Sequence, residues 1–304
     1  MDNLTHTLVG VTLANSGLSK KVGPGTTAVL AITSNLPDID ALWAYWNGGY
    51  SFLFRRMLTH SIVGVPLLAA AATFLFRLRY KELSWKTIFG LSLLGMGLHI
   101  VFDLLNSYGV SLLYPLSDRR FEWSVMFIID LTMWSLLLSP FLLSRIKSRW
   151  TGLEHLSRLS LAGVAIYILL CVGGEIRGER MLEKTAKENN LKPSFSYVFP
   201  EVFGPQRFRG VLKQGNEYTL YLLHVWKGIA EPRGVLLTDE DSSEVKSVRA
   251  IPLAQTLEWF YKAPVWKVAQ ASGGGKEVEV YDLRFRSFVL PPRLGPFFFR
   301  FKGP

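Results

Sequence analysis

The sequence predicts a two-part protein, a membrane α-helical bundle followed by a mostly β extramembrane domain. Hydrophobic residues make up 49% of the 304 residues, which is high for a soluble protein. Apolar segments fill the first half. After Gly173 and Gly174 the chain changes to short runs rich in Val, Leu, Tyr and Phe, bounded by Gly, Pro, Asn and Asp. We therefore expect a membrane-embedded helical domain over residues 1–174 and a mostly β domain over residues 175–304.

Four apolar segments of the first half are candidate membrane spans. They are residues 61–76, 87–105, 124–144 and 159–174, with lengths of 16, 19, 21 and 16 residues. A helix needs about 17 to 25 residues to cross a bilayer, so the middle two meet this length and the outer two are short. The sequence therefore predicts four spans.

Two shorter apolar stretches come first in the chain. Residues 4–18 and 26–36 are separated by Lys20, Lys21 and the turn Gly23-Pro24-Gly25. Neither is long enough to cross a bilayer alone, so we expect a short helical hairpin that dips into the membrane beside the spans. The first stretch does not fit a signal peptide, because a basic leading region and a small-residue cleavage site are missing.

The distribution of Lys and Arg predicts an orientation. If the first span ends in the cytoplasm, the cytoplasmic loops carry ten of these cations and the opposite loops carry four, Arg55, Arg56, Arg119 and Arg120. The positive-inside rule favours this choice. It predicts a multi-pass membrane protein whose C-terminal domain is extracytoplasmic.

Polar residues gather at the segment ends that this topology places outside. The candidate metal ligands are His6, Asp40, His60, His99 and Asp103. Imidazole and carboxylate groups bind divalent metals, and they are costly beside hydrocarbon unless paired, ligated or hydrated. Each residue alone also fits a helix cap or an interfacial hydrogen bond. Their convergence on one face predicts a shared divalent-metal site, with zinc favoured and manganese or iron as alternatives.

Two other carboxylates, Asp38 and Asp130, are candidate catalytic groups. Asp38 belongs to the turn Leu36-Pro37-Asp38-Ile39-Asp40, where a helix cap is the simpler interpretation of either aspartate alone. Asp130 lies within the apolar segment 124–144, where a carboxylate is expensive. We expect it to hold a histidine ring or to complete the site, with a proton relay as the alternative.

Other polar groups near the ligands are candidate substrate-binding residues. They are Arg55, Arg56, Asn106, Arg119 and Arg120. Guanidinium groups match phosphate or carboxylate, so the arginines fit an anionic substrate, although anchoring to anionic lipids explains them equally well. Asn106 is seven residues from His99 and shares a helix face with it.

The net charge of +10 is shared by both halves of the chain and forms no dense basic stripe with interleaved aromatic residues. Membrane lipids are therefore the expected partners, and no nucleic acid is expected. The single cysteine, Cys171, excludes intramolecular disulfides.

Four motifs resemble those of a known family. They are Met1-Asp2-x-x-Thr5-His6, Leu36-Pro37-Asp38-Ile39-Asp40, Leu58-Thr59-His60-Ser61 and Gly97-Leu98-His99-x-x-x-Asp103-x-x-Asn106-x-Tyr108-Gly109. Their order and spacing are similar to those of the bacterial YdjM-type proteins, also called membrane-bound metal-dependent hydrolases. The resemblance covers about the first 130 residues. It implies a hydrolase of the bacterial inner membrane with a metal site similar to that of zinc-dependent phospholipase C, carried here by His6, Asp40, His60, His99 and Asp103.

The expected activity is hydrolysis of an ester or phosphoester by metal-activated water, with a lipid or lipid-linked substrate reaching the site laterally. The ligand set exceeds the three protein ligands of a simple catalytic zinc site, so one filled site and two adjacent metals both stay open. Two other classes also stay open. A cation or proton transporter would use Asp38, Asp40, Asp103 and Asp130 as a relay, and a non-enzymatic membrane scaffold would hold a structural metal.

Overall fold

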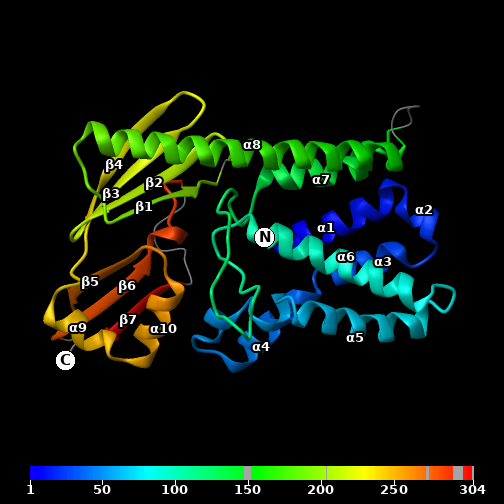
Figure 1. Ribbon diagram of the computed structural model, residues 1–304, viewed down its shortest axis with the longest axis horizontal. Helices are drawn as coiled ribbons and strands as arrows, with labels where there is room; N and C mark the ends of the chain where they lie inside the picture. The colour runs from blue at the N-terminus through cyan, green and yellow to red at the C-terminus, as the bar shows by residue number, and fades with distance from the viewer. Residues whose placement is uncertain (147–151, 203, 272–273, 290–296, 303–304) are drawn as a thin grey trace. The chain divides into compact units, whose positions relative to one another are not determined.

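The structure is a computed structural model that describes residues 1–146, 152–202, 204–271, 274–289 and 297–302. The chain forms two compact units, Met1–Cys171 and Val172–Pro304 (Figure 1). The first unit is helical, and the second contains the described β-strands. The predicted order, a helical part followed by a β-rich part, is therefore present.

The helical unit begins with a hairpin. Its elements are α1 (Asn3–Leu13), a π-helical turn η1 (Ala14–Leu18), α2 (Ser19–Val22) and α3 (Thr26–Thr33). Asp2 caps α1 by accepting a hydrogen bond from Thr5 N. The chain reverses at Gly23 and Gly25, whose φ angles of 118° and 92° are costly for any residue with a side chain. With 11 and 8 residues, α1 and α3 match the predicted pair of short helices.

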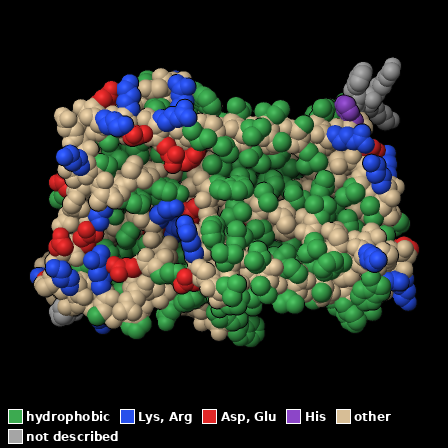
Figure 2. Space-filling view, viewed as in Figure 1, with side chains coloured by type: hydrophobic (Ala, Val, Ile, Leu, Met, Phe, Trp, Pro, Cys, Tyr) green, Lys and Arg blue, Asp and Glu red, His purple; other side chains and the backbone are tan. Residues whose placement is uncertain are grey.

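The rest of the unit combines short turns with longer helices. The elements are η2 (Leu36–Ile39), α4 (Asp40–Asn47), η3 (Ser51–Phe54), η4 (Leu58–His60), α5 (Gly64–Arg79), α6 (Trp85–Leu104), α7 (Leu131–Leu143) and α8 (Leu153–Glu188). Among the described helices, α6 and α8 are long and apolar enough to cross a membrane. A third candidate is the pair Ser51–His60 and Gly64–Arg79, bent by 74°. Figure 2 shows hydrophobic side chains covering much of the visible face over these helices.

Four full-length spans are not confirmed, and the predicted span 124–144 shows why. Residues 124–130, all of which the structure describes, form no helix, and α7 begins only at Leu131. Asp130 is the N-cap, because its side chain accepts a hydrogen bond from Met133 N. The helix that remains has 13 residues. Hydropathy marks apolar composition, whereas the position of the cap decides where the helix starts.

Two glycines let α1 and α6 approach α3 closely. A Cβ added at Gly10 would lie 2.7 Å from the Leu30 carbonyl oxygen, and one added at Gly95 would overlap Thr33 Oγ1. Gly10 follows His6 by one helical turn, and Gly95 precedes His99 by one turn. The close crossings therefore bring both histidines toward the end of α3.

The second unit contains two antiparallel sheets. The first has β1 (Phe195–Pro200), β2 (Arg207–Gln214), β3 (Glu217–His224) and β4 (Ile229–Leu237) in sequence order, and the second has β5 (Pro264–Gln270), β6 (Lys276–Asp282) and β7 (Phe298–Lys302). Between them come α9 (Ser243–Arg249) and α10 (Pro252–Phe260), and η5 (Leu283–Phe285) follows β6. Leu182 of α8 packs into the core of the first sheet. Arg209 and Glu201, each 1% exposed, form a buried ion pair at 2.7 Å.

Candidate metal centre

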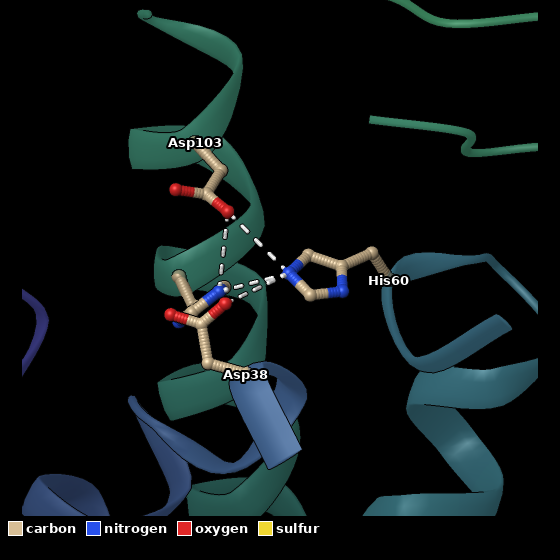
Figure 3. A group of neighbouring side chains, drawn as sticks. Asp38, His60 and Asp103 are labelled. Carbon is tan, nitrogen blue, oxygen red and sulfur yellow. Dashed lines mark hydrogen bonds and ion pairs between the residues drawn. The ribbon is translucent and has the colours of Figure 1, made fainter. Parts of the chain in front are cut away.

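Four buried side chains from three segments of the helical unit meet at one point. Asp38 comes from η2, His60 from η4, and His99 and Asp103 from α6. Each offers one ligand atom, and these atoms all lie within 4.8 Å of one another. Figure 3 shows the Asp38 and Asp103 carboxylates and the His60 ring pointing toward one another. We call these four residues the cluster.

Local structure explains how each residue reaches the cluster. His99 and Asp103 are four residues apart on α6, so they share one helix face. Asp38 lies in a 3₁₀ turn with Pro37 at its start. His60 ends η4, just before the sharp bend into α5, where a Cβ added at Gly64 would overlap the Leu58 carbonyl. Because of this bend, the His60 side chain points toward His99 and Asp103 of α6.

Hydrogen bonds fix which nitrogen of each ring carries the proton. His99 Nδ1 lies 2.7 Å from the Ser34 carbonyl oxygen, which can only accept. His60 Nδ1 lies 2.9 Å from Thr59 Oγ1, and that hydroxyl donates to Asp40 Oδ2 at 3.1 Å, so it accepts from His60. Nδ1 therefore carries a proton in each ring, and each Nε2 faces the cluster, where a neutral ring presents a lone pair.

The Nε2 atoms of His60 and His99 lie 3.1 Å apart. Two lone pairs at this distance cannot hydrogen-bond to each other, so they repel unless a positive charge lies between them. Asp103 Oδ2 lies 3.4 Å and 3.3 Å from the same two nitrogens, and Asp38 Oδ1 lies 3.8 Å from His60 Nε2. Two ligand atoms bound to one tetrahedral zinc are about 3.3 Å apart. The donor set and its spacing therefore fit one divalent metal.

His6 lies beside the cluster and not within the group of four. Its ring stacks on His99 with centroids 3.8 Å apart, and its Nε2 lies 3.2 Å from Asp103 Oδ1. The amino group of Met1 contacts the same oxygen. Asp103 thus turns one oxygen toward the cluster and the other toward α1.

Asp38 and Asp40 both lie differently from what the sequence suggested. Asp40, expected as a ligand, accepts hydrogen bonds from Thr59 Oγ1 and, at 2.7 Å, from Arg56 N. It therefore orients His60 through Thr59. Asp38, expected as a catalytic group, offers an oxygen to the cluster. Both lie in one tight turn, where side chains two residues apart point in different directions, so sequence spacing alone could not separate them.

Asp130 has partners other than the histidine ring that we expected. Its Oδ1 accepts from Met133 N at 2.9 Å, and its Oδ2 accepts from the Tyr167 hydroxyl at 2.7 Å. The carboxylate therefore caps α7 and ties it to α8. A buried carboxylate in an apolar segment needs a hydrogen-bond partner or a bound ion. For Asp130 the partners stabilise the packing of α7 and α8 and do not belong to the cluster.

The candidate substrate-binding residues divide into buried and accessible groups. Arg56, 3% exposed, places Nε 2.9 Å from Asp103 Oδ2 and donates to Asn106 Oδ1 at 3.3 Å. Arg120 donates to the backbone carbonyls of Gly109 and Leu53, both at 3.0 Å. The Arg119 guanidinium lies over the Phe121 ring.

Arg55 is the partly exposed arginine that reaches the cluster. Its side chain is 27% exposed, and Nη2 lies 2.8 Å from Asp38 Oδ1. Two groups that orient the rings were missed from the sequence, Thr59 and the carbonyl of Ser34. Thr59 adjoins His60 in the chain, which is a usable signal, whereas the Ser34 contact depends on how α3 and α6 pack.

Comparison with known proteins agrees with these motifs. The model of the family described as YdjM inner membrane protein matches residues 1–177, which include the whole cluster. The chain is also 29% identical over 126 residues to the uncharacterized protein YfhP of Bacillus subtilis (strain 168). That alignment covers 39% of this chain and spans 38% of the length of YfhP. No solved structure matches the chain. Since the family model covers more than half of the sequence, this chain belongs to the YdjM inner membrane protein family.

Proposed function

We propose that this protein is a metal-dependent hydrolase of the bacterial inner membrane that acts on an ester or phosphoester. The observation that carries the proposal is the pair of imidazoles with their Nε2 lone pairs 3.1 Å apart, beside two carboxylates. Buried polar groups are normally satisfied, and a divalent cation would satisfy both facing nitrogens while the two carboxylates balance its charge. Zinc suits this ligand set best, with manganese and iron as alternatives.

The residues of the chain have separate tasks in this proposal. Asp38, His60, His99 and Asp103 hold the metal, and Ser34, Thr59 and Asp40 hold the two rings in position. A divalent metal supplies Lewis-acid polarisation of a phosphoryl or carbonyl oxygen and makes water nucleophilic near neutral pH. Arg55 is the partly exposed cation next to Asp38, which supports a role for it in binding an anionic oxygen of the substrate.

The arrangement of the helices supports the orientation expected from sequence. His99 and Asp103 lie in the last turns of α6, whereas Lys86 lies at its start and Arg77 and Arg79 end α5. The positive-inside rule then places the basic ends in the cytoplasm and the cluster at the outer face.

The pairing of α7 and α8 extends this orientation to the second unit. Asp130 accepts from Tyr167, and Leu136 O accepts from Ser160 Oγ at 2.7 Å, so the two helices are antiparallel. If α7 runs from the outer face inward, α8 runs outward. The second unit is then extracytoplasmic, and a lipid or lipid-linked substrate could reach the cluster from the outer leaflet.

The test combines metal analysis with turnover. Purified protein in detergent should hold about one equivalent of divalent metal per chain, and it should cleave a phosphodiester, a phosphomonoester or a carboxylic ester in a chelator-sensitive way. His60→Ala should lose both metal and turnover, while the control His155→Ala on α8 should keep both. Equal metal content in the two variants would remove the cluster as the binding site. If the protein binds one metal per chain but turns over none of these substrates, a non-enzymatic membrane scaffold with a structural metal would be favoured.

A further inference from the structure

A strongly aromatic segment lies between two residues that contact the cluster. Residues 41–54 contain six aromatic side chains and no charged one. Asp40, just before this segment, accepts from the Thr59 hydroxyl that orients His60. Arg55, just after it, pairs with Asp38. Residues 41–54, here called the aromatic segment, are therefore held at both ends by the site.

Several large side chains of the aromatic segment, all on α4, are strongly exposed. Trp46 is 89% exposed, Tyr45 is 87% exposed and Leu42 is 69% exposed. Within α4, all of which the structure describes, Ala44 is the buried residue. Figure 2 shows hydrophobic side chains protruding at the lower edge of the view, where Figure 1 labels α4. Contiguous apolar surface of this kind marks an interaction site, so the segment needs a partner.

The neighbouring surface indicates which partner. Leu58, Ile62 and Leu67, on the bent candidate span that follows, are 50%, 59% and 65% exposed, so an apolar surface continues from the aromatic segment along that span. On a chain of an inner membrane family, such a surface faces lipid. The aromatic segment is therefore continuous with a surface that faces lipid.

The residue types place the segment at the boundary between lipid and water. Tyr and Trp combine an apolar ring with a polar tip, and they are enriched where acyl chains meet headgroups. Another exposed aromatic residue, Trp123, comes from a separate loop and lies at the end of α6, where its backbone N–H donates to the Leu104 carbonyl. A tryptophan is thus exposed at the end of α6 that carries Asp103, in addition to those of the aromatic segment.

We propose that the aromatic segment lies in the outer interfacial layer of the bilayer and keeps the cluster at headgroup depth, so that the substrate is a membrane lipid presented from that leaflet. The substrate class rests on the proposed hydrolase function, whereas the placement of the segment does not. The two ends of the aromatic segment, next to Asp40 and Arg55, connect it to the cluster and to its accessible cation.

The placement is tested by depth-dependent fluorescence quenching, which needs no turnover. In a Cys171→Ala background, a bimane label is attached to Trp46→Cys, and the protein is reconstituted in nanodiscs with nitroxide lipids. Two matched controls are Leu94→Cys, 41% exposed within α6, and Glu217→Cys in the second unit. The label at position 46 should be quenched most by nitroxide near the headgroup, and the label at position 94 by nitroxide deep in the acyl chain. The label at position 217 should be quenched by neither.

Two results would overturn the placement. One is a label at position 46 that behaves like the label at position 217. The other is a label at position 46 that lipid nitroxides do not quench, together with disulfide crosslinking of the unlabelled Trp46→Cys protein into a dimer, since a second copy of the chain would then cover the segment.

The substrate class is tested by comparing a lipid in vesicles with a water-soluble phosphodiester. Replacing Tyr45 and Trp46 by Ser should lower kcat/KM several-fold for the vesicle lipid and leave the soluble substrate and the metal content unchanged. Turnover of the soluble substrate alone by the unaltered protein would refute the lipid substrate. Turnover of neither these two substrates nor the phosphomonoester and carboxylic ester named above would refute the proposed function, and the quenching result would still decide the placement.

Discussion

His60 and His99 owe their orientation to partners outside the cluster. A carbonyl oxygen holds the Nδ1 proton of His99, and a hydroxyl linked to Asp40 holds that of His60. Partners of this kind fix the tautomer and the direction of a metal-binding ring, and their loss typically lowers metal affinity about 10- to 100-fold.

Thr59 allows a direct test of this orientation. Thr59→Val keeps the shape of the side chain but removes both the acceptor for His60 Nδ1 and the donor to Asp40. We expect zinc affinity to fall about 10- to 100-fold in a competition titration with a chelator. Thr59→Ser keeps the hydroxyl and should bind metal nearly as well as the unaltered protein. Equal affinity in the valine and serine variants would contradict the role assigned to Thr59.

Asp38 and Asp40 should respond differently to the same substitution. Asp38→Asn removes a charged ligand atom from the cluster, so metal should be lost during purification. Asp40→Asn leaves the four ligands in place and disturbs the hydrogen bond to Thr59, so metal should be retained with weaker affinity. Elemental analysis of the two proteins decides between the roles, and the reverse pattern would restore Asp40 as the ligand.

At the scale of the elements, the crossing of α3 and α6 determines whether the Ser34 carbonyl reaches His99. A Cβ added at Gly95 would overlap Thr33 Oγ1 and lie 3.1 Å from Ser34 N. Around Gly97, by contrast, nothing lies within 4 Å of an added Cβ among the described residues. Two glycines of one helix therefore provide a test and its control.

We expect Gly95→Ala to separate α3 from α6 and to lower both zinc affinity and thermal stability. Gly97→Ala should keep the affinity, and it should gain up to about 1 kcal/mol in stability because alanine favours the helix. Chelator competition and thermal unfolding of both variants give the comparison. Two variants with unchanged affinity would show that this crossing does not position His99.

The sequence predicted some elements well and others poorly, for physical reasons. The N-terminal hairpin and α6 follow from apolar runs that end at Lys20-Lys21, at glycines or at an N-cap, so their composition and their helices coincide. The start of α7 could not be read from hydropathy, because residues 124–130 are apolar but not helical. By contrast, the helix expected after Gly174 is present, because charged and small residues recur there at helical spacing and α8 continues to Glu188.

The same distinction applies to the site. His60, His99 and Asp103 were predicted from residue type and position, because few other residues suit both a metal and an apolar surrounding. The different positions of Asp38 and Asp40 and the structural role of Asp130 depend on tertiary contacts with Thr59, Arg56 and Tyr167. These contacts join residues that are distant in sequence, so they could not be predicted from sequence spacing.

For the whole molecule, the membrane orientation is the most consequential expectation. Cysteine substitutions at Asp118, in the loop after α6, and at Glu82, between α5 and α6, lie on exposed residues. In intact cells with Cys171→Ala, a membrane-impermeant maleimide should label position 118 and should reach position 82 only after the membrane is opened. The opposite labelling would place the cluster in the cytoplasm.

The central claim is that two histidines and two carboxylates bind one divalent metal. X-ray absorption at the zinc edge, on protein purified with zinc, tests it most directly. We predict two imidazole nitrogens at about 2.0 to 2.1 Å and carboxylate oxygens at about 2.0 to 2.2 Å, with no sulfur ligand. His99→Ala should remove this spectrum, while Gly97→Ala should retain it. A spectrum without imidazole scattering, or one unchanged in His99→Ala, would contradict the claim.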